Sequence, residues 1–505
     1  MAADAVNAKI GVEVHVPLRT ERKLFCDCPT NYWETEEPNV NTCPVCTGMP
    51  GAKPFPLNGG AVEAAVMVAE LLECEVARGN VFVKRKHYDY PDLPSGYQRT
   101  SEPFGVNGRL NGVGIWEVHL EEDPGRYDLK TGRVDYNRSG VPLIEIVTAP
   151  DMKSPEDVRE FMRALVNMLK YTERTVEVGG VMRADVNISI EGGAKVEIKN
   201  INSVAGAFKA IQYEMVRQKN MMRRGAVVQQ ETRGYDEKTM VTKPQRLKET
   251  AADYRYIPDP DIPPQEFTEE YTSGIQLPET PQLRKKKLVE DYGVGEADAQ
   301  TIVLDKDIAD MFEDVSKRLN HLVAEGGVDF VNERGMQVIL SVSRLVTRWI
   351  CREVRGQLNY RNIELRESKL DADNFIELLE LVYRGEITES TGKKILERVI
   401  DTGESPKELV RKDGSLKRIS DKSELDRITY RELLDNPKAV VDSVGNPKAL
   451  NHVMGKIRKS TSGSATPEVV RATLVHTVEE CIAASSGALT PDFVTNFMKK
   501  KLEEL

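Results

Sequence analysis

No hydrophobic run in the sequence is long enough to span a membrane. The longest apolar stretch, residues 61–72, is interrupted by Glu63 and Glu70, and it is shorter than the ~20 residues that a spanning helix needs. The first residues, MAADAVNAKIGVEVHV, contain no basic segment followed by an apolar one and therefore show no secretion signal. We expect a cytoplasmic protein that does not associate with membranes.

The sequence also lacks an excess of positive charge. It contains 70 Lys and Arg residues against 80 Asp and Glu residues, which gives a formal net charge of −10. This balance argues against non-specific nucleic-acid binding over the whole surface, although it leaves room for a local basic site.

The hydrophobic fraction of 40% and the charged fraction of 30% are typical of a folded soluble protein. The length of 505 residues predicts roughly two to four domains.

Several common catalytic motifs are missing. No GxxxxGK(S/T) phosphate-binding loop occurs, because the nearest match, at Gly385, Gly392 and Lys393, has the wrong spacing. No GxGxxG sequence follows a predicted strand, and no GxSxG elbow is present, so a serine nucleophile has no support. The cysteines are better suited to metal binding than to nucleophilic catalysis, which leaves glutaminase chemistry without support as well.

The pattern of secondary structure changes about halfway along the chain. Residues 8 to about 275 mix short β-rich runs with three helical patterns, at residues 58–74, 154–173 and 203–224. This mixture predicts an α+β region with a large, mostly antiparallel or mixed sheet and flanking helices. The proline-rich stretch 256–265 breaks regular structure, and the pattern from residue 277 onward is almost wholly helical. We expect three domains, at residues 1–276, 277–403 and 404–505.

Four of the seven cysteines lie close together near the start of the chain, as Cys26-x-Cys28 and Cys43-x-x-Cys46. Two close pairs joined by a loop supply four soft ligands for a tetrahedral zinc ion, and such a closed site is structural. The alternative is four reduced cysteines without a metal. A disulfide framework is not expected in the absence of a secretion signal. The remaining cysteines have apolar surroundings and are expected to be small core residues: Cys74, Cys351 and Cys481.

Acidic residues occur in or beside several predicted strands. Alternation along a strand places Glu13 and His15 on one face, and Glu145 lies inside the apolar run VPLIEIV, where an unpaired carboxylate is costly. If such carboxylates converge, Mg²⁺ or Mn²⁺ carrying nucleotide phosphates would relieve their repulsion. The alternative for each acid alone is a surface charge or a salt bridge. The candidates are Glu13, His15, Glu121, Glu122, Glu145 and Asp185.

Basic and aromatic residues follow in the same region. Basic side chains that could face phosphates are Lys84, Arg85, Lys86, Arg183, Lys199, Arg233, Arg246 and Arg255. Tyrosines near them could stack on an adenine or on a terminal tRNA base: Tyr88, Tyr90, Tyr97, Tyr254 and Tyr256. The alternative is that these are solvated charges and ordinary loop aromatics.

Ten ordered motifs resemble those of a known family. Among them are IGVEVHVPL, NTCPVCTGMPGAKP, RKHYDYPDLPSGYQ, DYNRSGVPLIEIVTAPD, MRADVNISI and DYRYIPDPD. In this order they resemble the GatB/GatE family, the B-type subunits of tRNA-dependent amidotransferases, and the resemblance covers nearly the whole chain. From the length of 505 residues, we do not expect the additional domain of the archaeal GatE type.

The resemblance implies an ATP-dependent amidation of misacylated tRNA. The family phosphorylates the side-chain carboxylate of Glu-tRNA(Gln) or Asp-tRNA(Asn). Ammonia delivered by the glutaminase subunit GatA, in a complex with GatC, then gives Gln-tRNA(Gln) or Asn-tRNA(Asn). The implied cofactors are ATP, Mg²⁺ and a structural Zn²⁺. The implied domains are a catalytic cradle with a zinc knuckle at residues 26–46, a helical domain and a YqeY-like tRNA-binding tail.

The resemblance also implies roles for single residues. The family's metal-binding positions fall on Glu13, His15, Glu122 and Glu145, which makes these the expected catalytic residues. Glu121 is an additional candidate metal ligand. Nucleotide contacts are expected from Lys84, Arg85, Lys86, Arg183, Asp185 and Lys199. Two other functions remain as alternatives: a non-enzymatic zinc-containing tRNA-binding adaptor, and a free-standing metallohydrolase that uses the His15 and Glu cluster.

Overall fold

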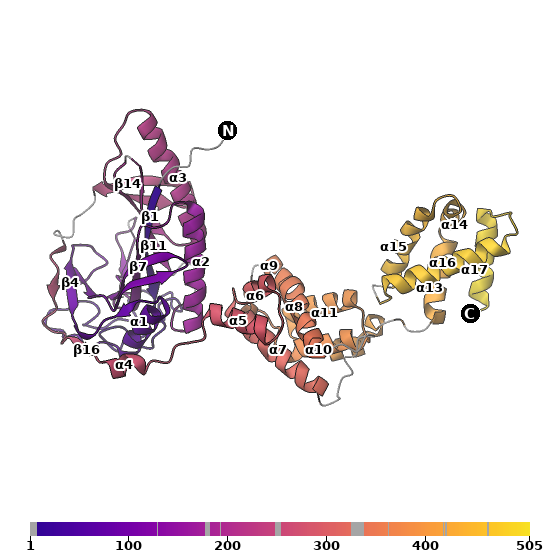
Figure 1. Cartoon of the computed structure of the whole chain (residues 1–505), viewed down its shortest axis with the longest axis horizontal. Helices are drawn as coiled ribbons and strands as arrows, with labels where there is room; N and C mark the ends of the chain where they lie inside the picture. The colour runs from indigo at the N-terminus through magenta and orange to yellow at the C-terminus, as the bar shows by residue number, and fades with distance from the viewer. Residues whose placement is uncertain are drawn as a thin grey trace. The chain divides into compact units, whose positions relative to one another are not determined.

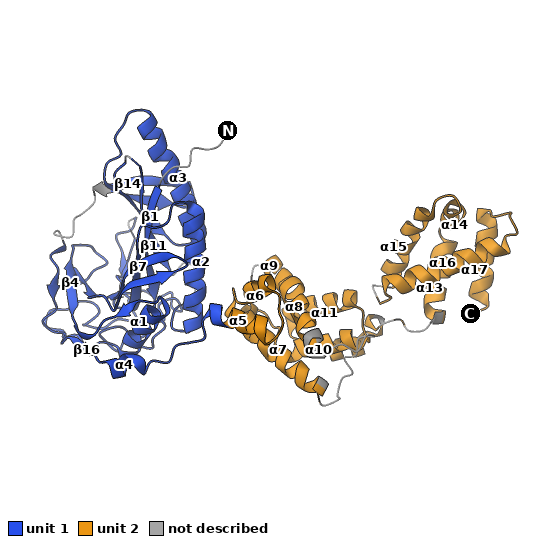
Figure 2. Cartoon of the chain, viewed as in Figure 1, with its two compact units in different colours: residues 1–283 blue, residues 284–505 orange. Residues whose placement is uncertain are grey.

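The structure is a computed structural model that describes most of the chain. The chain separates into two compact units, residues 1–283 and 284–505 (Figure 2). The described residues are 8–128, 130–176, 182–191, 193–247, 254–324, 338–361, 363–417, 419, 422–461 and 464–505. None of the described helices is both long and apolar enough to cross a membrane.

A large sheet forms the centre of the first unit, and its described part has twelve strands. The main strand order is β14-β13-β12-β11-β1-β10-β7-β5-β4-β15, with β6 beside β7 and β2 beside β6. All pairs are antiparallel except β12 with β13, so the prediction of an α+β fold with a mostly antiparallel sheet is confirmed. The strands are β1 (Ala8–Pro17), β2 (Glu75–Val76), β4 (Val83–His87), β5 (Tyr97–Ser101), β6 (Gly105–Leu110), β7 (Val113–Glu122), β10 (Pro142–Thr148), β11 (Arg183–Ile190), β12 (Val196–Ile201), β13 (Glu231–Asp236), β14 (Val241–Leu247) and β15 (Ile257–Pro258).

Three helices cover one face of this sheet, and α2 and α3 can be followed along it in Figure 1. They are α1 (Gly59–Leu71), α2 (Pro155–Thr172) and α3 (Val204–Arg223). Helix α2 begins with the cap that its first residues, Ser154-Pro155-Glu156-Asp157, predict: Ser154 accepts a hydrogen bond from the Asp157 N–H, and Asp157 accepts one from the Ser154 N–H. Smaller elements complete the unit: β3 (Gly79–Val81), β8 (Arg126–Tyr127), β9 (Val134–Asp135), β16 (Gln265–Phe267) and α4 (Glu269–Ser273).

Alternation along β1 explains which face is covered. Val12 and Val14 are buried in the hydrophobic core together with residues of the three helices. Glu13 and His15 point to the other face, since successive side chains of a strand alternate. The apolar half of the strand therefore anchors it to the helices. Its polar half lies on the face opposite α1, α2 and α3, which is called the helix-free face because none of these three helices covers it.

The second unit is helical and has two separate hydrophobic cores, one from residues 288–410 and one from residues 425–498. The first core is built by α5 (Pro281–Glu290), α6 (Glu296–Ile302), α7 (Lys306–Ala324), α8 (Val338–Arg348), α9 (Arg355–Arg361), α10 (Ala372–Tyr383), α11 (Glu389–Thr402) and α12 (Pro406–Lys412). The second is built by α13 (Lys422–Leu434), α14 (Pro437–Ser443), α15 (Leu450–Ser460), α16 (Pro467–Ala484) and α17 (Pro491–Glu503). The division into domains at residues 276 and 403 stays a prediction.

Candidate functional site

The helix-free face of the sheet brings together acidic residues from distant parts of the sequence. Antiparallel pairing places Glu13 opposite Asp185 of β11 and His15 opposite Glu145 of β10. Directly paired residues of neighbouring strands project to the same face. Glu121 of β7 joins them because it lies two residues beyond His119, which pairs with Glu145.

His15, Glu121 and Glu145 form a first group of possible metal ligands, with all their ligand atoms within 4.8 Å of one another. His15 Nε2 lies 3.3 Å from Glu145 Oε1, and Gln98 Nε2 donates a hydrogen bond of 3.0 Å to Glu121. One imidazole and two carboxylates are hard or borderline donors that suit a divalent cation.

Burial and mutual charge shift the pKa values of this group. Burial acts to raise the pKa of Glu145, but the hydrogen bond and the charge of His15 outweigh it and lower the pKa. Burial acts to lower the pKa of His15, and Glu145 outweighs this effect and raises it. Glu121 has its pKa raised by burial and by the charge of Glu145. The excess negative charge makes the group a place where a cation would bind.

Glu13, Asp185 and Glu197 form a second group, again with ligand atoms within 4.8 Å of one another. Burial and the charges of Glu145 and Asp185 raise the pKa of Glu13, and Asn187 Nδ2 donates to Glu13 at 2.8 Å. Lys199 Nζ lies 2.6 Å from Asp185 Oδ2. The sequence reasoning missed Glu197, although it lies between Val196 and Ile198 in the kind of apolar strand that singled out Glu145.

Glu122 lies apart from both groups. As the neighbour of Glu121 in β7 it projects to the opposite face, where Arg99 Nη1 lies 3.3 Å from its carboxylate. Arg99 Nε in turn donates to Asp259 at 2.8 Å. Asp259 also receives two hydrogen bonds of 2.9 Å from Arg85. This buried ion-pair network, which the sequence reasoning did not foresee, ties the segment around residue 259 to β4 and β5.

The residues of β4 that were predicted to face phosphates lie on both faces of the sheet. Lys84 and Lys86 share the face of Glu121, and Arg85 shares the face of Glu122. Burial acts to lower the pKa of Lys86, but the charges of Glu121 and Glu145 outweigh it and raise the pKa. Lys84 instead pairs with Glu102 at 2.8 Å. Of the three, Lys86 is the one that approaches the acidic groups.

The remaining basic candidates have other partners. Arg183 Nη2 lies 2.5 Å from Asp123 Oδ1. Arg233 is buried and donates to Thr242 at 2.8 Å, so it is a structural residue. The Arg255 carbonyl oxygen accepts a hydrogen bond of 3.0 Å from the His87 ring. The side chain of Arg246 lies outside the described part of the chain.

Four of the predicted tyrosines lie side by side next to Lys86. Tyr88 makes edge-to-face contacts with Tyr90 and Tyr254, and Tyr254 makes one with Tyr256, at centroid distances of 6.0–6.1 Å. Lys86 Nζ lies 5.0 Å from the Tyr254 ring centre. Tyr97 belongs to another contact, since its ring lies 4.6 Å from the Arg85 guanidinium.

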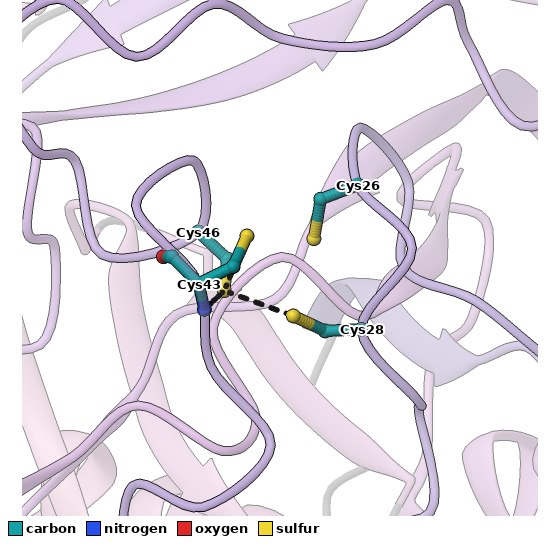
Figure 3. Close-up of side chains that lie close together, drawn as sticks. All are labelled: Cys26, Cys28, Cys43 and Cys46. Carbon is teal, nitrogen blue, oxygen red and sulfur yellow. Dashed lines mark hydrogen bonds between the residues drawn. The ribbon is translucent and has the colours of Figure 1, made fainter.

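The four clustered cysteines converge as predicted (Figure 3). Cys46 Sγ lies 4.0 Å from Cys28 Sγ and 3.9 Å from Cys43 Sγ. A tetrahedral zinc ion with Zn–S bonds of about 2.3 Å needs sulfur atoms about 3.8 Å apart, so these residues fit zinc. The hydrogen bond from Cys26 and the charge of Lys23 lower the pKa of Cys46 to about 5. Burial and the charge of Cys46 raise the pKa of Cys28 to about 12.

Fold and site together define a class: an α+β domain whose mixed sheet carries two groups of possible metal ligands, beside a closed four-cysteine knuckle. Comparison with protein families matches residues 8–273 to the GatB/GatE catalytic domain and residues 335–477 to the GatB domain. The chain belongs to the GatB/GatE family.

Individual relatives resemble the chain over nearly its whole length. Proteins named as the B subunit of aspartyl/glutamyl-tRNA(Asn/Gln) amidotransferase are 47% identical in Methanopyrus kandleri and 48% identical in Methanocaldococcus jannaschii. Each comparison covers 92% of this chain, and it covers 97% and 96% of the respective relative. A protein of the same name in Methanothermobacter thermautotrophicus is 46% identical over 91% of this chain and 98% of its own length.

Proposed function

We propose that this chain is the subunit of an ATP-dependent tRNA amidotransferase that activates the misacylated amino acid. Its substrates are Glu-tRNA(Gln), Asp-tRNA(Asn) or both, and its products are Gln-tRNA(Gln) and Asn-tRNA(Asn). The names of the relatives support this reaction. The observation that carries the proposal is the convergence of one histidine and five carboxylates on the helix-free face of the sheet.

The proposed reaction explains why a site with several carboxylates is needed. A carboxylate is a poor electrophile, so the γ-phosphoryl group of ATP is first transferred to the side-chain carboxylate, giving an acyl phosphate and ADP. Ammonia then attacks the acyl carbon, the C–O bond to phosphate breaks, and the amide and inorganic phosphate are released. Mg²⁺ neutralises negative charge on the phosphoryl group when it is bound.

Residues of this chain would divide the work between them. His15, Glu121 and Glu145 would hold one Mg²⁺, and Glu13, Asp185 and Glu197 would hold a second. Lys86 and Lys199 would bring positive charge to phosphate oxygens beside the carboxylates. We favour Glu121 over Glu122 as a metal ligand, since Glu122 is held by Arg99 on the opposite face. Nucleotide contacts from Lys84, Arg85 and Arg183 stay predictions.

The reaction also requires a source of ammonia and a surface that contacts tRNA. We infer that ammonia comes from an amidase subunit of the GatA type in a complex that also contains a GatC-type subunit, because the sequence contains no recognisable nucleophile motif for glutamine hydrolysis. We assign tRNA contact to residues 436–505, where nine Lys and Arg residues exceed seven Asp and Glu residues. This slight excess contrasts with the negative charge of the whole chain.

Two carboxylate variants test the proposal. In the complex reconstituted with both partner subunits, Glu121→Gln and Glu145→Gln should abolish ATP-dependent formation of amidated aminoacyl-tRNA without abolishing tRNA binding. Glu160→Gln, on the exposed side of α2, is the matched control and should retain full activity. Full activity of both site variants would refute the assignment. Binding of tRNA by the wild-type complex without any ATP turnover would favour the adaptor instead.

A further inference from the structure

A completely buried lysine lies against the four-cysteine knuckle. The side chain of Lys23 is 0% exposed. Its Nζ donates to the Asn41 carbonyl oxygen at 2.7 Å and to the Tyr136 carbonyl oxygen at 3.3 Å, and it lies 3.5 Å from Cys46 Sγ. Among the residues that the structure describes, none pairs a carboxylate with this ammonium group.

A buried ammonium group needs a compensating negative charge, because removing a charge from water without a partner is strongly unfavourable. Carbonyl oxygens satisfy its hydrogen bonds but do not neutralise it. The nearest source of negative charge is the cysteine cluster, since four thiolates bound to one divalent ion leave two net negative charges. The positive charge of Lys23 and the negative charge of the metal-loaded cysteine cluster therefore compensate each other. Either charge would be unfavourable if it were buried without the other.

We propose that Lys23 is a positioning residue of the four-cysteine metal site, where its ammonium group hydrogen-bonds the Cys46 sulfur and neutralises part of the charge of a bound metal tetrathiolate. Outer partners of this kind orient the ligands of a metal and tune its affinity. The ligand is a thiophilic divalent cation, and the proposal does not depend on the amidotransferase reaction.

The same lysine links the knuckle to the sheet. Lys23 itself contacts Tyr136. Nearby, the Ser139 hydroxyl donates to the Cys46 carbonyl oxygen at 2.9 Å, and the Leu24 N–H donates to the Gly140 carbonyl oxygen at 2.9 Å. Gly140 has φ +80°, and its N–H donates to the Asp123 carbonyl oxygen just after β7. Metal binding at the knuckle therefore stabilises the segment that connects β7 and β10, the strands that carry Glu121 and Glu145.

Lys23→Met and Lys23→Gln test the role of the charge. Methionine has nearly the length of lysine but carries no charge, and glutamine is also uncharged but keeps hydrogen-bond donors. Competition with a chromophoric chelator should show zinc dissociation constants raised roughly 10- to 100-fold in both variants of the full chain. Lys53→Met is the matched control, because that exposed lysine pairs with Asp261 and not with the cysteines. Wild-type zinc affinity in Lys23→Met would overturn the proposal, and so would an effect confined to that variant.

Two further measurements separate this role from a purely structural one. With the metal bound, Lys23→Met should lower the unfolding temperature more than it does in excess chelator, because binding shifts stability through the affinity that is lost. Equal shifts in both conditions would mean that Lys23 only supports the fold. In the Co²⁺-loaded chain, loss of the hydrogen bond should move the thiolate-to-metal charge-transfer band to lower energy, and an unchanged band would contradict the contact with Cys46.

Discussion

The ion-pair network around Asp259 allows a prediction of how much folding stability the chain loses when this residue is replaced. The Asp259 side chain is completely buried and accepts three charge-assisted hydrogen bonds, two from Arg85 and one from Arg99, at 2.8–2.9 Å. Asp259→Ala would leave the guanidinium groups of Arg85 and Arg99, whose side chains are 18% and 8% exposed, without their shared carboxylate. We expect this variant to unfold much more easily than the wild-type chain.

The structure sets the size of the effect. Removing one partner of a buried ion pair costs about 3–5 kcal/mol. Arg85 keeps Asp261 at 3.2 Å and Arg99 keeps Glu122 at 3.3 Å, so we expect the lower end, about 3 kcal/mol. For a unit of this size that corresponds to a fall of roughly 6–12 °C in the unfolding temperature. Asp259→Asn keeps an acceptor oxygen and should lose less.

Urea denaturation of the full chain measures the loss of stability, and hydrogen exchange of peptides from β4 and β5 shows whether it is local. Asp261→Asn is the matched control, because its carboxylate is 26% exposed and a partly exposed ion pair contributes at most about 1 kcal/mol. If Asp259→Ala lost no more stability than this control, the buried network would not hold the segment around residue 259 to the sheet.

Three other predictions concern the cysteine knuckle, the His119–Glu117 pair and the C-terminal tail. Metal analysis should find about one zinc per chain, and Cys43→Ser should lose most of it; no zinc in the wild-type chain would contradict the four-cysteine site. Burial acts to lower the pKa of His119, but its hydrogen bond with Glu117 outweighs this and raises the pKa to about 9. That pair therefore stabilises the fold fully between about pH 4.5 and about pH 6.5. It loses its effect as the pH rises through about 9, and also in acid once Glu117, whose pKa the His119 hydrogen bond lowers, becomes protonated. Glu117→Gln should lower the His119 pKa in an NMR titration, and an unchanged value would refute the pairing. Deleting residues 436–505 should weaken tRNA binding more than ATP binding in filter and calorimetric assays, and unchanged tRNA affinity would contradict a role for the tail.

Local sequence patterns predicted much of the fold. Alternation in β1 placed Glu13 and His15 together, since the side chains of a strand repeat every second residue. The Ser154 cap followed from the pattern of Ser, Pro and Asp at the start of α2. The spacing of the four cysteines likewise predicted that their sulfur atoms converge. Each of these features depends on residues within one element or one short loop.

The same patterns did not separate Glu121 from Glu122. Alternation requires these neighbours to point to opposite faces of the sheet, but the chain by itself does not say which face carries the other carboxylates. The pairing of β7 with β10 decides this, because it aligns Glu145 with His119 and places Glu121 on the same face. Glu197 joins the site through the pairing of β12 with β11, and this partnership is equally invisible in the sequence.

The sequence by itself therefore determined the residue types, the α+β class of the first unit, the helical second unit and the cysteine knuckle. The tertiary structure alone decided which carboxylates share a face, and it revealed the contacts of Lys23 with Tyr136 and of Asp259 with Arg85, across 113 and 174 positions of the chain. The physical reason is that local preferences act over a few residues. The register between strands and the neutralisation of buried charges depend instead on partners that only the folded chain brings together.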